Sequence, residues 1–335
     1  MNKKVTIKEV AKQANVSTAT VSNVINNTKF VSEEVRTRVL HVIEELNFHA
    51  NTLAKGLRIQ ESRLIGVIVS DIANPFFSKV VSGIEKGAAE MGYNILLCNT
   101  ASNLDKEIEF LNILKGKRVE GLIISSSGTT KEYFESLENL NIPIVFLNRS
   151  PNTPSHKVVI TNNIKGANKA TEHLIQHGYT RIGIISGPTS LSTGKDRLTG
   201  YKRAMEDYHL SIPDSYIQEG DFSIESGYRA MKDLLTLNKD LEACLISNNF
   251  MTLGAHKYIK EAGYSIPNDI AVIGYDDSDW ADVMDPPLTT VKQPTFEQGQ
   301  KAIEMLFSTI RNENHHKQQI MYLQPSLVIR KSCGC

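Results

Sequence analysis

TIKEVAKQANVSTATVSNVIN, residues 6–26, is the stretch of sequence that decides how the N-terminal part of this chain folds. Thr6 and Glu9 have the spacing of a capping box, in which a hydroxyl and a carboxylate satisfy free amides at a helix start. Apolar residues then recur at helical spacing as far as Asn15, and Ser17 is a good N-cap for a second helix. The stretch therefore predicts two short helices joined by a tight turn.

The second of these helices is expected to bury Val21, Val24 and Ile25 and to expose a face of small, mostly polar side chains. A short exposed helix of this kind suits the DNA major groove, which admits one helix and is read by hydrogen bonds. An ordinary helical hairpin inside a larger helical domain fits the spacing equally well. The side chains expected on the exposed face are Thr18, Ala19, Ser22, Asn23 and Asn26.

Two more helices are predicted before residue 60. Ser32 can cap a third helix over about residues 33–46, whose apolar positions would close a three-helix core and leave Arg36 and Arg38 outside to touch phosphates. The segment NTLAKGLR, residues 51–58, reads as a helix too short to be stable alone, and Gly56 weakens it further. We expect this last segment to fold only when a partner holds it.

Composition indicates a globular chain of more than one domain. Its 335 residues exceed the size at which a single core stops growing, and 41% are hydrophobic while 22% are charged. No apolar run has the length of a signal-peptide core or a membrane span, so the cytoplasm is the expected location.

Charge is unevenly distributed along the sequence. Residues 1–60 carry nine Lys and Arg against five Asp and Glu, a net charge of +4, and the rest of the neutral chain therefore carries −4. A small basic piece on an acidic body is typical of a phosphate-contacting module attached to a ligand-binding domain.

The four cysteines show no regular spacing, which argues against a disulfide framework. Cys333 and Cys335 form a C-x-C that can bind metal or respond to oxidation. Two thiols are too few for a closed zinc site, and no histidine cluster lies nearby in the sequence. His173 and His177 read as surface residues of a helix. We therefore expect no metal site and no cofactor.

From Arg63 onward the pattern alternates between buried strands and helices, which implies βαβ units with parallel sheets. It occurs twice, which predicts two similar α/β lobes with a ligand site in the cleft between them, at the carboxyl ends of the strands. The predicted strands are residues 64–69, 94–98, 121–125, 142–147, 181–186, 216–221, 243–247 and 270–276.

Aromatic and planar polar side chains gather just after these strand ends. Aromatic faces beside Arg, Asn, Asp and Gln suit a sugar, whose ring face stacks while each hydroxyl takes a donor and an acceptor. Taken singly, a loop Asn or Asp more often makes a turn, and an Arg is usually a solvated charge. The residues concerned are Asn74, Phe76, Phe77, Asn148, Arg149, Arg197, Phe222, Asn248, Asp276 and Gln293.

Over nearly its whole length the chain resembles the LacI/GalR family of bacterial transcription regulators. The resemblance implies a homodimer that binds near-palindromic double-stranded operator DNA, with hinge helices in the minor groove and a sugar-binding body like that of periplasmic binding proteins. The motifs that carry it are VTIKEVAKQANVSTATVSNVIN, NTLAKGLR, SDIANPFF, IPIVFLNR, GKDRLTGY, SNNFMTLGA, IAVIGYDD and LTTVKQP.

The resemblance also implies roles for single residues. Thr18, Ala19 and Asn23 match base-reading positions. Leu57 matches a leucine that pries open the central base step, and Ala54 matches its neighbour in the groove. Positions that mostly set phosphate contacts are matched by Thr6, Ser17, Thr20, Ser22 and Asn26, and the ten strand-end residues match the sugar-contacting set of ribose-type members.

The resemblance implies four divisions of the chain. Residues 1–49 form an all-α helix-turn-helix headpiece, 50–62 a hinge helix and linker, and 63–331 a two-lobed α/β effector-binding and dimerisation domain, with 332–335 as a tail. The first lobe is expected over about 63–161 and 294–319, and the second over about 162–293 and 320–331. No leucine-heptad tail follows, which favours a dimer over a tetramer.

Three departures from the family pattern change what we expect. Asn23 stands where many members have a guanine-reading arginine, and asparagine pairs best with adenine. Ala50 stands where a proline is common. Asn148 and Asn249 occupy positions that are often aspartate, so that two arginines face Asp276 and an acidic or phosphorylated sugar fits as well as a neutral pentose.

Two other classes of function are weighed against a regulator. A sugar-processing or nucleotide-using enzyme would need a P-loop, a G-x-G-x-x-G fingerprint or a catalytic set, and the sequence shows none. A transport-associated sugar-binding protein would need a signal peptide and no basic headpiece. An effector-controlled repressor is the favoured reading.

Overall fold

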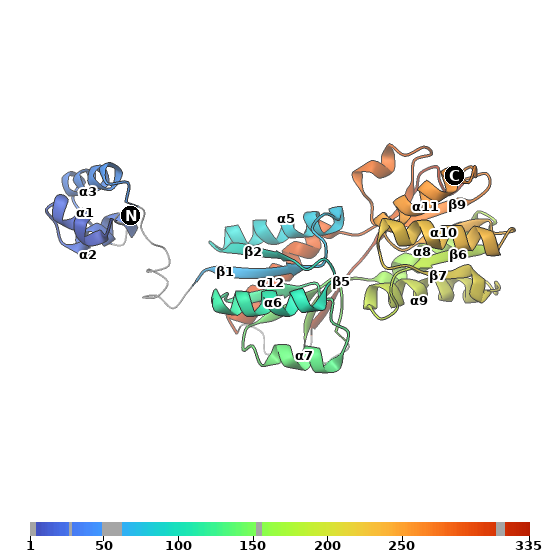
Figure 1. The fold of residues 1–335 in the computed structure, drawn as a ribbon, viewed down its shortest axis with the longest axis horizontal. Helices are drawn as coiled ribbons and strands as arrows, with labels where there is room; N and C mark the ends of the chain where they lie inside the picture. The colour runs from blue at the N-terminus through green and yellow to red at the C-terminus, as the bar shows by residue number, and fades with distance from the viewer. Residues whose placement is uncertain (1–4, 27–28, 49–61, 152–155, 313–318) are drawn as a thin grey trace. The chain divides into compact units, whose positions relative to one another are not determined.

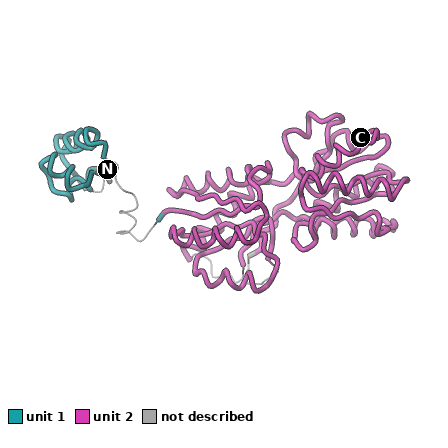
Figure 2. Tube along the Cα trace, viewed as in Figure 1, with its two compact units in different colours: residues 1–62 teal, residues 63–335 magenta. Residues whose placement is uncertain are grey.

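The computed structural model describes residues 5–26, 29–48, 62–151, 156–312 and 319–335. The chain divides into two compact units, residues 1–62 and residues 63–335 (Figure 2). Within the described ranges no helix combines the length and apolar character that crossing a membrane requires.

The first unit is a three-helix bundle of α1 (Ile7–Gln13), α2 (Thr18–Asn26) and α3 (Glu33–Glu45). Its core is made of small aliphatic side chains from all three helices, among them the fully buried Val10, Val21 and Val39. Small side chains let such short helices approach closely, so that about forty residues can build a core of their own.

The predicted helix starts differ in how they are stabilised. The capping box of Thr6 and Glu9 is present, and Ser17 Oγ accepts a hydrogen bond of 3.1 Å from the Thr20 amide, which confirms both N-caps. Ser32 occupies the N-cap position of α3, but its side chain makes no capping bond, so that expectation is wrong. Glu33 and Glu34 instead place negative charge at the positive end of the helix dipole.

The first lobe of the second unit is a six-stranded parallel sheet in the order β11-β5-β4-β3-β1-β2. Two helices, α5 (Pro75–Glu90) and α12 (Thr295–Ile310), cover one face, and α6 (Leu104–Gly116) and α7 (Lys131–Glu138) cover the other (Figure 1). The strands are β1 (Leu64–Val69), β2 (Asn94–Asn99), β3 (Gly121–Ile124), β4 (Ile144–Leu147), β5 (Lys157–Thr161) and β11 (Gln319–Leu323).

The second lobe repeats this plan with the sheet order β12-β10-β9-β8-β6-β7, in which only β12 is antiparallel. One face is covered by α8 (Asn163–Gln176) and α9 (Ser192–Asp207), the other by α10 (Ile224–Leu237) and α11 (Asn249–Glu261). The strands are β6 (Ile182–Ser186), β7 (Ile217–Glu219), β8 (Ala243–Ile246), β9 (Ala271–Tyr275), β10 (Thr289–Lys292) and β12 (Ser326–Val328), with short 3-10 turns at Asp214–Tyr216 and Asp279–Asp282. The fold class expected from the sequence is confirmed.

Two segments near the C-terminus lie elsewhere than the sequence predicts. β11 pairs with β5 and so belongs to the first lobe, and the chain crosses to the second lobe only between Leu323 and Ser326. Residues 332–335 are not a free tail, because Ser332 and Cys333 are fully buried and Cys333 joins the second lobe's core. Both errors arise because strand pairing and burial at a chain end depend on distant partners.

Helices α5 and α12 approach each other through glycine. A Cβ atom on Gly83 would lie 2.2 Å from the carbonyl oxygen of Phe296, and one on Gly299 would lie 2.1 Å from that of Val80. These contacts leave no room for a side chain at either glycine. The close packing of α5 against α12 therefore fixes the position of Asn74, the N-cap residue of α5.

The fold predicts a loss of stability in mild acid through His256 on α11. Burial lowers the pKa of this imidazole to about 4, against about 6.5 in an unfolded chain. The unfolded state therefore takes up the proton first, and stability that is complete above pH 6.5 is lost as the pH falls from 6.5 towards 4, by about 2 kcal/mol at pH 5.

Urea denaturation at pH 7 and pH 5 checks this expectation. His256→Gln is expected to lose about 2 kcal/mol less than the unmodified chain between the two pH values. The exposed His209, replaced by Asn, serves as the control and keeps the full pH dependence. Equal losses in all three proteins would show that His256 does not carry this effect.

Candidate functional site

A cavity of about 740 Å³ lies between the two lobes of the second unit. This volume falls within the range of small-molecule pockets. All ten residues that the sequence singles out after strand ends line it, and seven of them are buried polar or charged side chains. The seven are Asn74, Asn148, Arg149, Arg197, Asn248, Asp276 and Gln293, and the other three are the aromatic residues Phe76, Phe77 and Phe222.

Arg149 supplies a buried positive charge from the first lobe. Its Nη1 donates to the carbonyl oxygen of Ser126 at 2.9 Å, and burial lowers the pKa of its guanidinium to about 10, so it stays charged at neutral pH. The negative charge of the fully buried Glu107 opposes this lowering of the Arg149 pKa. The Glu107 carboxylate accepts hydrogen bonds from Ser126 Oγ at 2.7 Å and from Tyr133 OH at 2.5 Å. This carboxylate could not be predicted from the strand-end rule, because Glu107 lies on α6.

Arg197 supplies a second buried charge, from α9 in the second lobe. Its Nε donates to Asn163 Oδ1 at 2.8 Å, its Nη1 donates to the carbonyl oxygen of Ser247, and its guanidinium lies 3.8 Å from the centre of the Tyr275 ring. Cation–π stacking and two hydrogen bonds fix one planar orientation that a lysine cannot reproduce.

Asp276 places a carboxylate in the same wall. Burial raises the pKa of this group, and the Arg197 charge and a hydrogen bond of 2.5 Å from Gln293 Nε2 oppose the rise. Each buried arginine is therefore matched by a buried carboxylate, Glu107 for Arg149 and Asp276 for Arg197.

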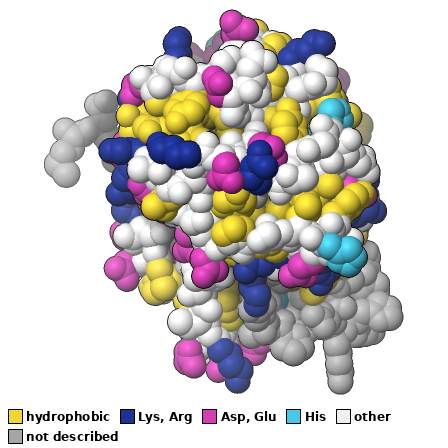
Figure 3. Space-filling model, turned by 90° about the vertical axis from the view of Figure 1, so that its right-hand side faces the viewer, with side chains coloured by type: hydrophobic (Ala, Val, Ile, Leu, Met, Phe, Trp, Pro, Cys, Tyr) yellow, Lys and Arg dark blue, Asp and Glu magenta, His cyan; other side chains and the backbone are white. Residues whose placement is uncertain are grey.

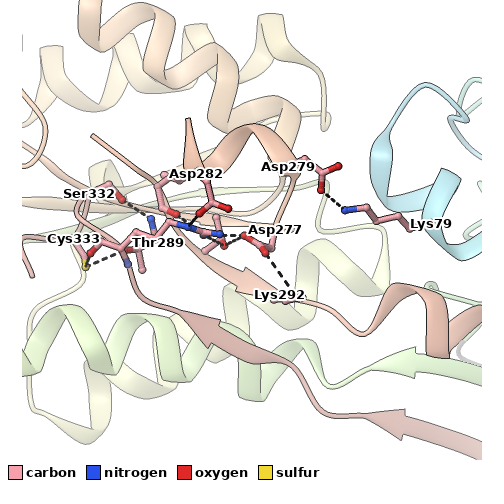
Figure 4. A network of polar contacts seen from close by, with 11 residues as sticks. Lys79, Asp277, Asp279, Asp282, Thr289, Lys292, Ser332 and Cys333 are labelled. Atoms are coloured by element: carbon pink, nitrogen blue, oxygen red, sulfur yellow. Dashed lines mark hydrogen bonds and ion pairs between the residues drawn. The ribbon is translucent and has the colours of Figure 1, made fainter. Parts of the chain in front are cut away.

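An amide pair joins the lobes at the cavity. Asn74 Nδ2 donates to Asn249 Oδ1 at 3.0 Å, and Asn249 Nδ2 donates back to Asn74 Oδ1 at 2.9 Å, with both residues buried. An aspartate at position 249 could accept but not donate. Nearby, the Lys79 ammonium on α5 reaches Asp279 of the second lobe at 2.7 Å (Figure 4).

Five residues that line the cavity hold left-handed backbone conformations that residues other than glycine rarely adopt: Ala101 and Ser102, and three of the ten residues predicted from the sequence. The φ angles of Asn148, Phe222 and Asp276 are 62°, 70° and 72°. Such conformations cluster at ligand sites, where the surrounding structure enforces them. A Cβ on Gly187 would lie 2.0 Å from the Phe222 ring, so glycine there makes room for this aromatic face.

The cavity wall also contains residues that the sequence analysis missed. Asp71, Asp221 and Glu225 add negative charge, but they are partly or fully exposed, whereas Arg149, Arg197 and Asp276 are buried. Their strand-end loops were visible in the sequence, but their direction into the cavity was not. The remaining missed residues are Ser70, Ala101, Ser102, Thr193, Ser223, Ile224 and Phe250.

The predicted DNA-contacting residues lie on the first unit. Thr18 and Ala19 are exposed on α2, and Ser22 and Asn23 are partly exposed. Thr6, Ser17 and Thr20 contribute side chains to the helix starts described above, and α2 ends at Asn26. The predicted hinge residues Ala50, Ala54 and Leu57 lie outside the described residues.

Comparison with known proteins finds two family models, one for each of the two units of the chain. A family model described as bacterial regulatory proteins, lacI family, matches residues 6–51, and one described as periplasmic binding proteins and sugar binding domain of LacI family matches residues 62–326. The HTH-type transcriptional repressor PurR of Aliivibrio salmonicida (strain LFI1238) is 37% identical over 328 residues, 98% of each chain. The chain belongs to the LacI family of bacterial regulators.

Two solved structures extend this assignment across the LacI-family fold. The lac repressor dimer bound to operator and the anti-inducer ONPF is 31% identical with a TM-score of 0.88, over 99% of both chains. A LacI family transcriptional regulator from Enterococcus faecium with bound ribose is 30% identical with a TM-score of 0.70, over 80% of this chain and 98% of that one. The chain is thus a DNA-binding transcriptional regulator controlled by a small-molecule effector, and not an enzyme.

The geometry predicts that Arg197→Lys destabilises the second unit although the charge is kept. Lysine cannot bond Asn163 and Ser247 and also stack on Tyr275, so buried acceptors lose their donors at a cost of about 1–3 kcal/mol in the free energy of unfolding. Urea denaturation measures the change. Arg203→Lys, an exposed position on the same helix, is the matched control, and equal stability of the two variants would contradict the role given to Arg197.

Proposed function

We propose that this LacI-family regulator is a homodimeric repressor whose affinity for a near-palindromic operator is set by a neutral sugar bound between the lobes. The observation that carries the effector proposal is the charge-balanced, buried cavity wall that joins both lobes. A ligand that contacts both lobes favours one position of the lobes relative to each other. It therefore binds one conformation of the protein more tightly than another, which is what control of DNA binding by an effector requires.

Base reading is assigned to Thr18, Ala19 and Asn23 on α2. The exposure of Thr18 and Ala19 supports this assignment, as does the rigid start of α2 at Ser17 and Thr20. Backbone contacts are proposed for Thr6, Ser17, Thr20, Ser22 and Asn26, and the minor-groove contacts for Ala54 and Leu57 remain a proposal from the resemblance alone.

The chemistry of the effector follows from the cavity wall. The sequence suggested two arginines against one aspartate, and hence an acidic sugar as a candidate equal to a neutral one. Glu107 changes that balance, because the buried groups now total two positive and two negative charges. Asn148 Oδ1, Arg149 Nε and Gln293 Oε1 have no partner among the described residues and offer hydrogen bonds that sugar hydroxyls can take.

Similar proteins support the remaining parts of the proposal. The ribose held by the Enterococcus faecium regulator is a neutral pentose, and the lac repressor of known structure is a dimer on its operator. For this chain we propose a dimer and a cytoplasmic location, with the protein on the nucleoid when it is bound to operator.

Asn23 is predicted to select adenine where an arginine in its place would select guanine. Asparagine makes two hydrogen bonds to adenine, and arginine makes two to guanine O6 and N7. Sequencing of DNA selected by the purified protein is expected to return A at one position of each half-site, and Asn23→Arg is expected to change that position to G. Thr37→Ala, an exposed change on α3, should leave the selected site unaltered. Selection of G by the unmodified chain would refute the assignment.

Calorimetric titration with matched sugars tests the effector class. The unmodified chain should bind a neutral pentose more tightly than its uronate or phosphate. Glu107→Gln removes one buried negative charge and is expected to improve relative binding of the acidic sugar by roughly tenfold. Glu109→Gln, an exposed change on the same helix, is the control. Binding of acidic sugars only would overturn the charge argument.

A further inference from the structure

Four sulfur and nitrogen ligands converge where the C-terminus meets α8. Cys335 Sγ lies 3.0 Å from His177 Nε2, 3.4 Å from His173 Nε2 and 3.1 Å from Cys333 Sγ, and Cys333 Sγ lies 3.4 Å from His173 Nε2. Figure 3 views the molecule from the right-hand side of Figure 1 and shows that histidine side chains reach this surface. We call these four residues the Cys2His2 cluster.

The helix supplies one half of the cluster by simple periodicity. His173 and His177 are four residues apart and so lie on one face of α8 and its C-cap, with ring centres 4.3 Å apart. The sequence analysis missed the cluster because these histidines precede the cysteines by about 160 residues. Its expectation of surface histidines was incomplete, since His173 is partly buried.

The other half is held by a firmly anchored chain end. Ser332 Oγ accepts from the Thr289 amide at 2.8 Å and donates to the carbonyl of Val272 at 2.6 Å, and Cys333 Sγ lies 3.1 Å from Thr289 Oγ1 (Figure 4). Gly334 then turns with a φ of 92°, which brings the second thiol back towards the first. The backbone thus presents both sulfurs to α8.

His177 makes the hydrogen bond at its second ring nitrogen that usually supports a metal ligand. His177 Nδ1 donates to the carbonyl oxygen of His173 at 2.8 Å, since a carbonyl can only accept, and this leaves the Nε2 lone pair towards Cys335. Such a bond at the second ring nitrogen is the usual support of a metal-binding histidine.

The ligand atoms of His173, Cys333 and Cys335 lie within 4.8 Å of one another, as three corners of a tetrahedral site require, and His177, in contact with Cys335, would supply the fourth. Zinc bonds of about 2.3 Å to sulfur and 2.0–2.1 Å to nitrogen place neighbouring ligand atoms about 3.3–3.8 Å apart. The four separations of 3.0–3.4 Å given above are a few tenths shorter, and the exposed Cys335 and His177 can move to complete the tetrahedron. Two thiolates and two imidazoles are the ligand set of structural zinc sites.

We propose that the Cys2His2 cluster binds one Zn²⁺ ion per chain, with both thiols releasing their protons to solvent as they bind. The ion would fasten the last residues of the chain to the end of α8. The same helix begins at Asn163, which bonds Arg197 in the cavity wall. The site is separate from the cavity, so it stands or falls independently of the effector proposal.

Cobalt and zinc titrations of the reduced, full-length protein test this proposal. Co²⁺ should give the absorption of a tetrahedral ion with a thiolate charge-transfer band, and one equivalent of Zn²⁺ should displace it. Cys335→Ser and His177→Gln each remove an exposed ligand and are expected to weaken Zn²⁺ binding at least tenfold. Loss of a group that only supports a ligand already weakens metal binding by about 10–100-fold, and loss of the ligand itself should cost no less. Cys98→Ser, a thiol on β2, is the matched control and should bind normally.

A second measurement on the unmodified chain does not depend on any variant. Zn²⁺ should protect the exposed Cys335 from alkylation, read by mass spectrometry, while the partly exposed Cys98 still reacts. An octahedral cobalt spectrum without a sulfur band, zinc binding equal in all variants, or alkylation unchanged by zinc would each overturn the proposal. A Cys333–Cys335 disulfide that persists in a reducing buffer would overturn it as well.

Discussion

Burial of two guanidinium groups in the wall of one cavity is the constraint on which the rest of this structure depends. A buried charge is costly unless it is paired and hydrogen-bonded, so Arg149 and Arg197 each require a carboxylate and fixed acceptors. The negative charge of Glu107 on α6 stabilises charged Arg149 in the first lobe, and that of Asp276 after β9 stabilises charged Arg197 in the second. Asn148 and Asp276, which lie in the same wall, hold left-handed φ angles of 62° and 72°, as residues at ligand sites often do.

Polar side-chain contacts join the two lobes beside the cavity. The reciprocal amide pair of Asn74 and Asn249 joins the start of α5 to the start of α11, and Lys79 with Asp279 adds an exposed ion pair. Exposed ion pairs stabilise little, so the buried amide pair contributes more than Lys79 and Asp279 to holding the lobes in this arrangement. Arg197 extends the connection to Asn163 and hence to α8, whose other end carries the Cys2His2 cluster.

Much of this arrangement could be predicted from sequence, and the failures have one cause. The headpiece follows from local signals such as the Thr6 capping box, and the ten cavity residues follow from one rule about strand ends. Glu107, the pairing of β11 with β5, and the approach of His173 to Cys333 depend on contacts between residues far apart in the chain. Periodicity carries no information about such contacts. Glu107 mattered most, because this single buried carboxylate is the reason that we propose a neutral sugar over an acidic one.

The most direct test of the account is the affinity of the cavity for its sugar, measured by calorimetry with and without saturating operator DNA. If effector and operator binding are coupled, operator must change the sugar's Kd by the same factor by which the sugar changes the operator's Kd, within about 5–150-fold for typical allosteric proteins. We predict equal factors that differ from one, and no effect of random-sequence DNA. An unchanged sugar Kd in the presence of operator would contradict the claim that the cavity controls DNA binding.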